Sequence, residues 1–149
     1  MFARALLAFL VLPGVVAFLV PALALGLAGS TAVVHPAGLV LALAGIAALL
    51  ACVRDFFVAG KGTLAPWAPP RELVRVGLYR RTRNPMYVAV VAIVAGWSAA
   101  FGSPGLLLYA VALAVAFHLR VVRNEEPFLA RVHGEEWERY RREVPRWLR

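Results

Sequence analysis

The distribution of charged residues constrains this chain more than any other feature of its sequence. Residues 5–53 and residues 86–119 contain no Asp, Glu, Lys or Arg, which leaves two uncharged blocks of 49 and 34 residues. Across all 149 residues, 62% are hydrophobic and 16% are charged, whereas soluble domains average about 45–50% and about 25%. The composition excludes a disordered chain and a disulfide-rich secreted scaffold, and it indicates an integral membrane protein.

The first uncharged block is long enough for two membrane-spanning helices, because each needs about 20 apolar residues. Small and turn-forming residues interrupt the block at 29–36, which predicts spans over 3–28 and 37–58. Pro13 and Pro21 lie inside the first predicted span, where a membrane helix accepts a proline kink. A soluble helical bundle is excluded, since its helices would need polar faces that this block does not contain.

A turn at 101–104 divides the second uncharged block. Ser103 is suited to cap a helix and Pro104 to occupy its first position, so the sequence predicts a tight hairpin of spans over 85–101 and 104–123. We therefore expect an all-α, polytopic membrane protein with about four transmembrane helices and a C-terminal cytoplasmic amphipathic segment.

The positive charges predict the orientation of these spans. If the N-terminus is cytoplasmic, all 16 basic residues fall on one side of the membrane, because the two outer turns contain none. Both termini are then cytoplasmic. We expect a bacterial inner-membrane protein whose basic surface meets membrane lipids and no nucleic acid. In an alternative interpretation, residues 1–28 are a signal peptide with a cleavage site at 22–24.

The predicted hairpin places two polar segments at the same cytoplasmic face. One segment, at 84–87, starts the third span, and the other, Glu125 with Glu126, follows the fourth span. Such a place, between water and lipid, suits a polar cofactor and an apolar acceptor that approaches from the bilayer. In a simpler interpretation, the nearby arginines only anchor the topology, and the two carboxylates pair with Arg120 and Arg123 at the surface.

The sequence indicates no other kind of catalytic centre. His35 and His118 have no second ligand at a metal-binding spacing, so we expect no metal site. The glycines around the single lysine, at 60–63, lack the spacing of a nucleotide-binding loop. Asp55 is the one aspartate, and the serines lie near the outer turns, so Ser-His-Asp catalysis has no candidate residues.

Aromatic residues in the charged tail allow two interpretations. The tail at 131–149 is suited to form a basic amphipathic helix on the membrane surface. Trp137, Tyr140, Trp147 and Leu148 then either anchor the tail in the membrane interface or close a site.

Two motifs on either side of the predicted hairpin resemble a known family. Residues 60–63 read GKGT and residues 69–87 read PPRELVRVGLYRRTRNPMY; the C-terminal motif reads EEP at 125–127, GEEW at 134–137 and VPRWL at 144–148. In this order the motifs resemble those of the isoprenylcysteine carboxyl methyltransferase and phospholipid methyltransferase superfamily. The resemblance extends over residues 60–148.

The resemblance implies a helical membrane enzyme that uses S-adenosylmethionine and releases S-adenosylhomocysteine, without a Rossmann-type domain. We expect a single domain over 1–149, in which 1–58 form an N-terminal helical hairpin and 59–149 form the cofactor-binding region with the cytoplasmic tail. The residues that the resemblance assigns to the cofactor pocket are Leu73, Val74, Tyr79, Asn84, Pro85, Met86, Tyr87 and Glu125.

The implied chemistry is a displacement in which an acceptor attacks the methyl group on a cationic sulfur. Glu125 and Glu126 would orient the cofactor or, with an amine acceptor, take its proton. Arg120 or Arg123 would hold an anionic acceptor. Family members often have His where this chain has Asn84, which removes an ionisable imidazole but keeps hydrogen-bonding capacity.

The identity of the methyl acceptor stays open at this point. The resemblance favours the carboxylate of a prenylated cysteine, and the alternative is N-methylation of an aminophospholipid or methylation of another small amphiphile. An interpretation of a different class is a noncatalytic membrane scaffold whose arginines bind anionic lipids.

Overall fold

Helices account for the regular secondary structure of the described part of the chain. The computed structural model describes residues 10–27, 34–59 and 72–148, so the predicted turn at 29–36 is seen only in part and the GKGT segment at 60–63 lies outside the described residues. The predicted all-helical class is confirmed for the described ranges. In chain order the elements are η1 (Leu10–Leu19), α2 (Val20–Leu27), α3 (Pro36–Ala59), η2 (Gly77–Arg80), α4 (Pro85–Phe101), α5 (Pro104–Arg120), η3 (Val121–Glu125) and α6 (Glu126–Glu143).

Two helices of the described chain are long and apolar enough to cross a membrane. One is the Pro36–Phe56 part of α3, and the other begins at Pro104 and runs through α5. The segments Pro13–Leu27 and Pro85–Phe101 are apolar but shorter. At 1.5 Å per residue, the 17 residues of α4 extend about 25 Å, slightly less than a hydrocarbon core of about 30 Å. These two helices are consistent with the predicted membrane protein, and the four-span topology stays a prediction.

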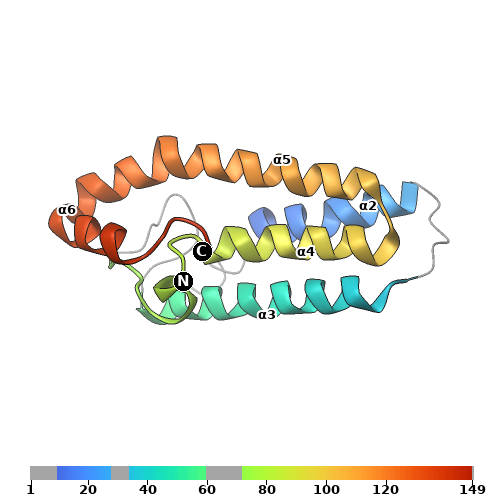
Figure 1. The fold of residues 1–149 in the computed structure, drawn as a ribbon, viewed down its shortest axis with the longest axis horizontal. Helices are drawn as coiled ribbons and strands as arrows, with labels where there is room; N and C mark the ends of the chain where they lie inside the picture. Colours follow the sequence, from blue (N-terminus) through green and yellow to red (C-terminus); the bar gives the residue numbers. More distant parts are fainter. Residues whose placement is uncertain (1–9, 28–33, 60–71, 149) are drawn as a thin grey trace.

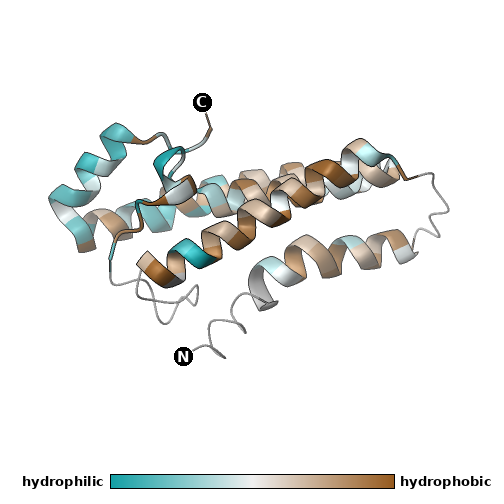
Figure 2. Ribbon diagram, turned by 90° about the horizontal axis from the view of Figure 1, so that it is seen from below, coloured by the Kyte–Doolittle hydropathy of each residue, from teal (hydrophilic) through white to brown (hydrophobic). Residues whose placement is uncertain are grey.

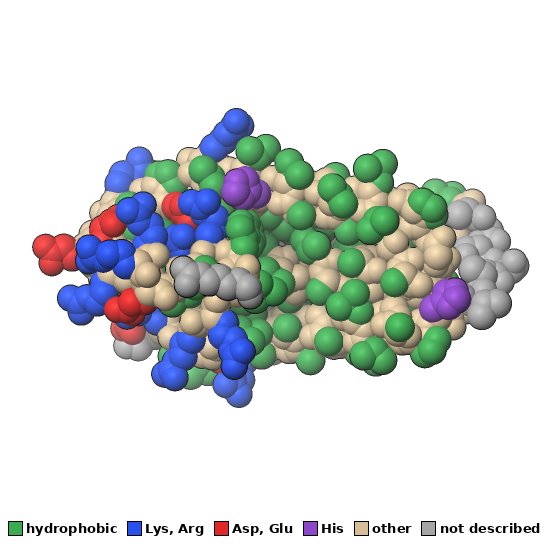
Figure 3. All heavy atoms as spheres, in the orientation of Figure 1, with side chains coloured by type: hydrophobic (Ala, Val, Ile, Leu, Met, Phe, Trp, Pro, Cys, Tyr) green, Lys and Arg blue, Asp and Glu red, His purple; other side chains and the backbone are tan. Residues whose placement is uncertain are grey.

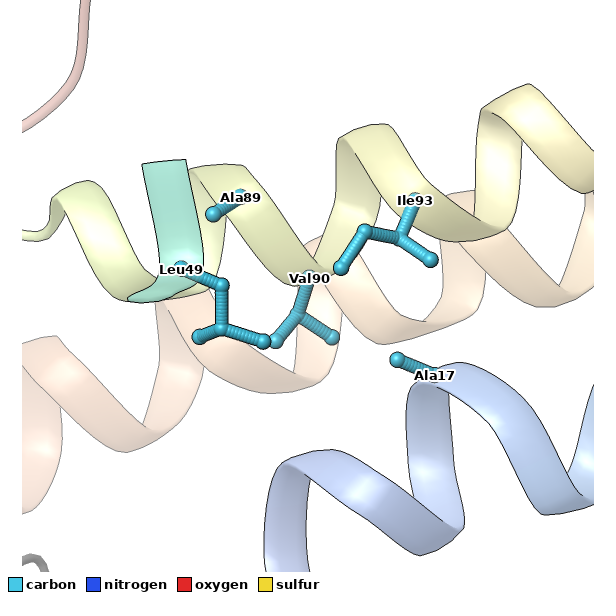
Figure 4. Close-up of a cluster of buried hydrophobic side chains, with 5 residues drawn as sticks. All are labelled: Ala17, Leu49, Ala89, Val90 and Ile93. Carbon is cyan, nitrogen blue, oxygen red and sulfur yellow. The ribbon is translucent and has the colours of Figure 1, made fainter. Parts of the chain in front are cut away.

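Helix α4 is the centre of the helical bundle. It packs against α3 on one side, α5 on another and η1 on a third, and the long helices run side by side along the molecule (Figure 1). Their shared core is a cluster of buried side chains contributed by η1, α3 and α4 (Figure 4). Its members are Ala17, Leu49, Ala89, Val90 and Ile93.

Small residues allow α3 and α4 to approach closely. A Cβ atom added to Gly96 of α4 would lie 2.5 Å from the backbone nitrogen of Ala42 in α3. One added to Gly38 of α3 would lie 2.1 Å from the backbone nitrogen of Ala100 in α4. Small residues at such helix interfaces let backbones pack directly, which is the main source of helix association in lipid.

The predicted proline distortion takes the form of a π-helix. Element η1 is π-helical over ten residues and contains Pro13, and it continues into α2. A proline has no N–H to donate and leaves a carbonyl of the preceding turn unpaired. Local π-type backbone is one of the ways in which membrane helices accommodate the freed groups.

The turn between α4 and α5 has the predicted chemistry. The Ser103 hydroxyl accepts a hydrogen bond from the Leu106 N–H at 3.4 Å, and Pro104 occupies the first helical position. Gly102 ends α4 in the left-handed conformation, with φ of 59°, which glycine adopts without steric cost. This short turn makes α4 and α5 antiparallel, so the start of α4 and the end of α5 lie at the same end of the molecule.

Charged residues gather at that end. Figure 3 shows basic and acidic side chains over one end of the molecule and hydrophobic side chains over the remainder of that face. Figure 2 shows the hydrophilic residues concentrated in α6 and at the adjoining end of the molecule. Large apolar side chains stay exposed along α3 and α5, among them Val40, Leu43, Leu108 and Val111, as expected of surfaces that face lipid.

Candidate functional site

The candidate site lies where the start of α4 meets the end of α5 and η3. The hairpin brings Tyr87 into hydrogen-bonding contact with Glu125, although 38 residues separate them in sequence. The C-terminal segment, defined here as Val144–Leu148, returns to the same place from α6 (Figure 1). The structure therefore brings the two predicted polar segments, 84–87 and Glu125 with Glu126, together at one end of the molecule.

The first cluster consists of Tyr87, Glu125 and Arg120. The Tyr87 hydroxyl donates a hydrogen bond to Glu125 Oε1, which also accepts one from Arg120 Nε at 2.8 Å. Arg120 Nε lies 3.1 Å from the Tyr87 hydroxyl as well. The Tyr87 ring stacks on Phe117 of α5, with 4.4 Å between centroids. The cluster borders solvent, because the Glu125 side chain is 31% exposed and that of Arg120 is 51% exposed.

The second cluster consists of Glu126 held between Arg83 and Arg146. Arg146 binds Glu126 with two hydrogen bonds of 2.8 Å, from Nε to Oε1 and from Nη2 to Oε2. Arg83 Nη1 lies 2.8 Å from Glu126 Oε1 in an ion pair. Burial alone would raise the pKa of Glu126, but the hydrogen bonds from Arg146 and the charges of both arginines outweigh it and hold this pKa below its ordinary value.

Arg83 is the most buried cation of these two clusters. Its side chain is 7% exposed, and its guanidinium lies over the Trp137 ring at 5.1 Å from the centroid. Burial lowers the pKa of Arg83 and Glu126 partly offsets that effect. Arg83 Nε is buried without a hydrogen-bond partner among the described residues. With two arginines on one carboxylate, the second cluster carries excess positive charge.

Asn84 fastens the C-terminal segment to the start of α4. Its side-chain nitrogen donates to the carbonyl oxygen of Arg146 at 3.1 Å, and the Thr82 hydroxyl donates to the same oxygen at 2.9 Å. The Arg83 N–H donates to the carbonyl oxygen of Pro145 at 2.9 Å. Asn84 precedes α4 without capping it through its side chain, and Pro85 takes the first helical position.

Other residues predicted to bind the cofactor lie in packed clusters beside these polar groups. Val74 and Tyr79 are buried with Cys52 of α3, and the half-buried Met86 packs against them. Leu73 packs against the buried cluster of Trp137, Tyr140 and Val144. These positions support the polar clusters and do not add charge to them.

One of the two carboxylates has the partner expected in the simpler surface interpretation, and the other does not. Arg120 pairs with Glu125 as that interpretation expects. Glu126 pairs with Arg83 and Arg146 instead, and Arg123 is exposed with no ion pair to a described residue. The physical reason is that the C-terminal segment folds back onto α4 and carries Arg146 to Glu126.

The tail residues that were predicted either to anchor in the membrane or to close a site differ in how deeply they are buried. Trp137 is 2% exposed and Tyr140 is 3% exposed, and the Tyr140 hydroxyl donates to the Tyr79 carbonyl oxygen at 2.7 Å. The interpretation of these two as membrane anchors is therefore wrong, because they pack against the protein. Trp147 is half-buried and donates through Nε1 to His118 Nδ1 at 3.2 Å, whereas Leu148 is exposed.

Sequence reasoning missed Arg83 and Arg146 as the partners of Glu126, and Trp137 as the ring beneath the Arg83 guanidinium. Arg83 is one of the arginines that the simpler interpretation treats as topology anchors, and the available signal was its position directly before the Asn84 turn. Arg146 stands inside the C-terminal motif, between Pro145 and Trp147, which could have marked it. Among the described residues no group of three or more His, Cys, Asp or Glu side chains is arranged to hold a metal ion.

A comparison with protein families identifies a match. A family model described as phospholipid methyltransferase matches residues 27–136, which include both α4 and the Glu125–Glu126 pair. Curated proteins and solved structures gave no match.

Proposed function

Because the chain belongs to the phospholipid methyltransferase family, we propose that it transfers a methyl group from S-adenosylmethionine to a lipidic or small amphiphilic acceptor at the membrane surface. The observation that carries this proposal is the junction of Tyr87, Glu125 and Arg120. It joins the two sequence motifs at the polar end of an otherwise apolar bundle.

The polar groups of the two clusters fit this methyl donor. S-adenosylmethionine supplies a methyl group on a cationic sulfur, and it also carries a carboxylate, an ammonium group and a nucleoside. A partly exposed carboxylate, Glu125, suits its cationic part. The buried Nε of Arg83, which lacks a hydrogen-bond partner among the described residues, suits its carboxylate. Asn84, Pro85, Met86 and Tyr87 form the segment that links these two groups.

The proposed roles of the protein groups are binding and orientation. A methyl displacement needs the acceptor in line with the bond that breaks, so positioning supplies much of the rate. Positive charge on sulfur disappears during the reaction, so a carboxylate that bound the sulfonium too tightly would slow the transfer. The hydrogen bonds from Tyr87 and Arg120 to Glu125 moderate its charge, which suits a group that orients the donor.

Glu125 and Glu126 differ in their surroundings and therefore in the roles we propose for them. Two arginines hold Glu126 and keep its pKa low, which makes it a weak base. Glu125 is more exposed, and Tyr87 and Arg120 both act on its Oε1. If the acceptor is an amine, which must be neutral to attack, Glu125 is therefore the base we assign.

Two arginines, one in the first cluster and one beside it, are suited to hold an anionic part of the acceptor. Arg120 uses Nε for Glu125 and Tyr87, and Arg123 is exposed three residues further along the chain. A prenylcysteine carboxylate and the phosphate of an aminophospholipid both present an anion to such groups. We propose a cytoplasmic location for this end, with both termini inside a bacterial inner membrane, because the basic residues gather there.

The test of the donor site is calorimetric titration of detergent-purified protein with S-adenosylmethionine. We expect micromolar binding by the wild type. The Glu125→Gln variant should bind about tenfold more weakly, since it loses a charge and a charge-assisted hydrogen bond. Glu138→Gln is the matched control, because Glu138 is also in an exposed ion pair, with Arg141, but lies outside both clusters.

Each result has a definite meaning for the proposal. Weaker binding by Glu125→Gln with unchanged binding by Glu138→Gln supports the assigned site. A folded wild type that binds neither S-adenosylmethionine nor S-adenosylhomocysteine contradicts the methyltransferase proposal and favours a lipid-binding scaffold.

A further inference from the structure

A buried carboxylate lies outside the two clusters, near the end of α3. Asp55 is 5% exposed, and it lies within the apolar Pro36–Phe56 segment that is long enough to cross a membrane. A buried carboxylate is costly unless it is paired or hydrogen-bonded, so the groups around Asp55 must account for its burial.

The ion pair of Asp55 with Arg54 does not account for this burial. Arg54 Nη2 lies 3.1 Å and Nε 3.3 Å from Asp55 Oδ1. The Arg54 side chain, however, is 78% exposed whereas that of Asp55 is 7% exposed. Water screens the cation of such a pair, so the pair contributes little to holding the carboxylate inside the protein.

The other carboxylate oxygen of Asp55 faces the backbone of Gly77. A Cβ atom added to Gly77 would lie 2.0 Å from Asp55 Oδ2 and 3.1 Å from Cγ. Gly77 also has a φ of 56°, in the left-handed region that favours glycine. The glycine is thus required for two reasons, its conformation and the space that the carboxylate occupies.

The segment that begins at Gly77 continues directly into the residues of the candidate site. Gly77 starts η2, in which the Tyr79 ring contacts Phe56 of α3 at 5.7 Å between centroids. Tyr140 of α6 hydrogen-bonds the Tyr79 carbonyl oxygen from the other side. The turn is therefore held between the end of α3 and α6, and it is followed by the residues that bind Glu126 and the C-terminal segment.

We propose that Asp55 is a positioning residue for this turn. Its carboxylate fixes the backbone at Gly77, and the fixed turn holds the segment from Arg83 to Tyr87 in the arrangement that binds the methyl donor. The role rests on the proposed function. Asp55 acts through η2 and does not itself touch either cluster.

The test compares three variants of the full-length protein in detergent. Asp55→Ala removes the contact with Gly77, and Asp55→Asn keeps its shape and one acceptor oxygen. Leu49→Ala is the control, because it opens a cavity in the buried core of α3 and α4. Two quantities are measured: the Kd for S-adenosylmethionine, and the hydrogen-exchange rate of the amides at 77–84.

We expect Asp55→Ala to raise the Kd about tenfold and the exchange rate at 77–84 about tenfold. Asp55→Asn should stay within about threefold of the wild type in both quantities, since asparagine has nearly the same shape and keeps an oxygen or nitrogen atom against Gly77. Leu49→Ala should lower the thermal midpoint without either change. These results would support the positioning role.

Three results would overturn the inference. One is exchange at 77–84 that Asp55→Ala leaves unchanged, and another is an Asn variant as impaired as the Ala variant. The third is a Leu49→Ala variant that changes Kd and local exchange as much as Asp55→Ala does. A wild type that does not bind S-adenosylmethionine would remove the proposed function, and the exchange rates would still decide whether Asp55 fixes the turn.

Discussion

Glu125 and Glu126 are adjacent in sequence but face different partners. Glu125 meets Tyr87 and Arg120 at the border with solvent, whereas Glu126 is held between two arginines and is only 13% exposed at its side chain. We expect the first to serve the methyl donor and the second to fasten the C-terminal segment to α4. The two roles are separable by experiment because one affects binding and the other affects stability.

The second cluster, in which Glu126 is held between Arg83 and Arg146, gives a prediction for the free energy of unfolding and its pH dependence. Replacement by Gln leaves Arg83 and Arg146 without their anion, which should cost about 2 kcal/mol or more at neutral pH. Since the folded-state pKa of Glu126 is lowered, its contribution is present above the unfolded-state pKa of about 4.3 and is lost as pH falls through the folded-state value.

The measurement is the thermal unfolding midpoint in detergent between about pH 7 and about pH 3. The gap between the wild type and Glu126→Gln should be large at neutral pH and should shrink in acid. Glu138→Gln should differ little from the wild type, because its ion pair is exposed. A gap that stays constant down to the acid end would show that Glu126 is not the titrating group.

Single-residue assignments show where sequence reasoning was effective and where it was limited. The meeting of residues 84–87 with Glu125 and Glu126 followed from the antiparallel hairpin alone, because helix length and turn position are local properties. The partners of Glu126 were not predictable in this way. Arg146 reaches Glu126 only because α6 reverses the chain and Trp137 and Tyr140 bury against the segment before α4.

At the scale of elements, the pairing of α3 with α4 depends on small residues. Gly96 has no room for a side chain, since an added Cβ would lie 2.5 Å from the Ala42 backbone nitrogen. The sequence predicted both helices from their apolar length and from the turn residues around them. It did not predict their partners, because an apolar helix in lipid has several faces on which it could pack.

The substitution Gly96→Ala should therefore destabilise the protein even though alanine favours helices. We expect a loss of about 1–3 kcal/mol from overpacking against a backbone that cannot move aside easily. Gly105→Ala in α5 is the matched control, because a Cβ added there would meet nothing closer than the Ser103 hydroxyl oxygen at 3.9 Å. That control should be neutral or stabilising by up to about 1 kcal/mol. Equal thermal midpoints for the two variants would contradict the close α3–α4 contact.

At the scale of the whole molecule, the structure separates an apolar bundle from a polar end. The helices expose apolar side chains along their length, and the charged residues gather where α4 begins, α5 ends and α6 folds back (Figures 2 and 3). This division was visible in the sequence as two uncharged blocks. The supporting contact of Asp55 with Gly77 was not, because it joins α3 to a turn that has no periodicity to mark it.

The central claim is that this polar end transfers methyl groups to an amphiphilic acceptor. The most direct test reconstitutes the protein in vesicles that contain phosphatidylethanolamine, adds S-adenosylmethionine labelled in its methyl group, and measures label in the extracted lipid. A parallel reaction replaces that lipid with a prenylated cysteine. We predict label in one of the two acceptors and a loss of about tenfold or more in Glu125→Gln, with Glu138→Gln unchanged. No label in either acceptor, from a folded protein that binds the donor, would contradict the claim.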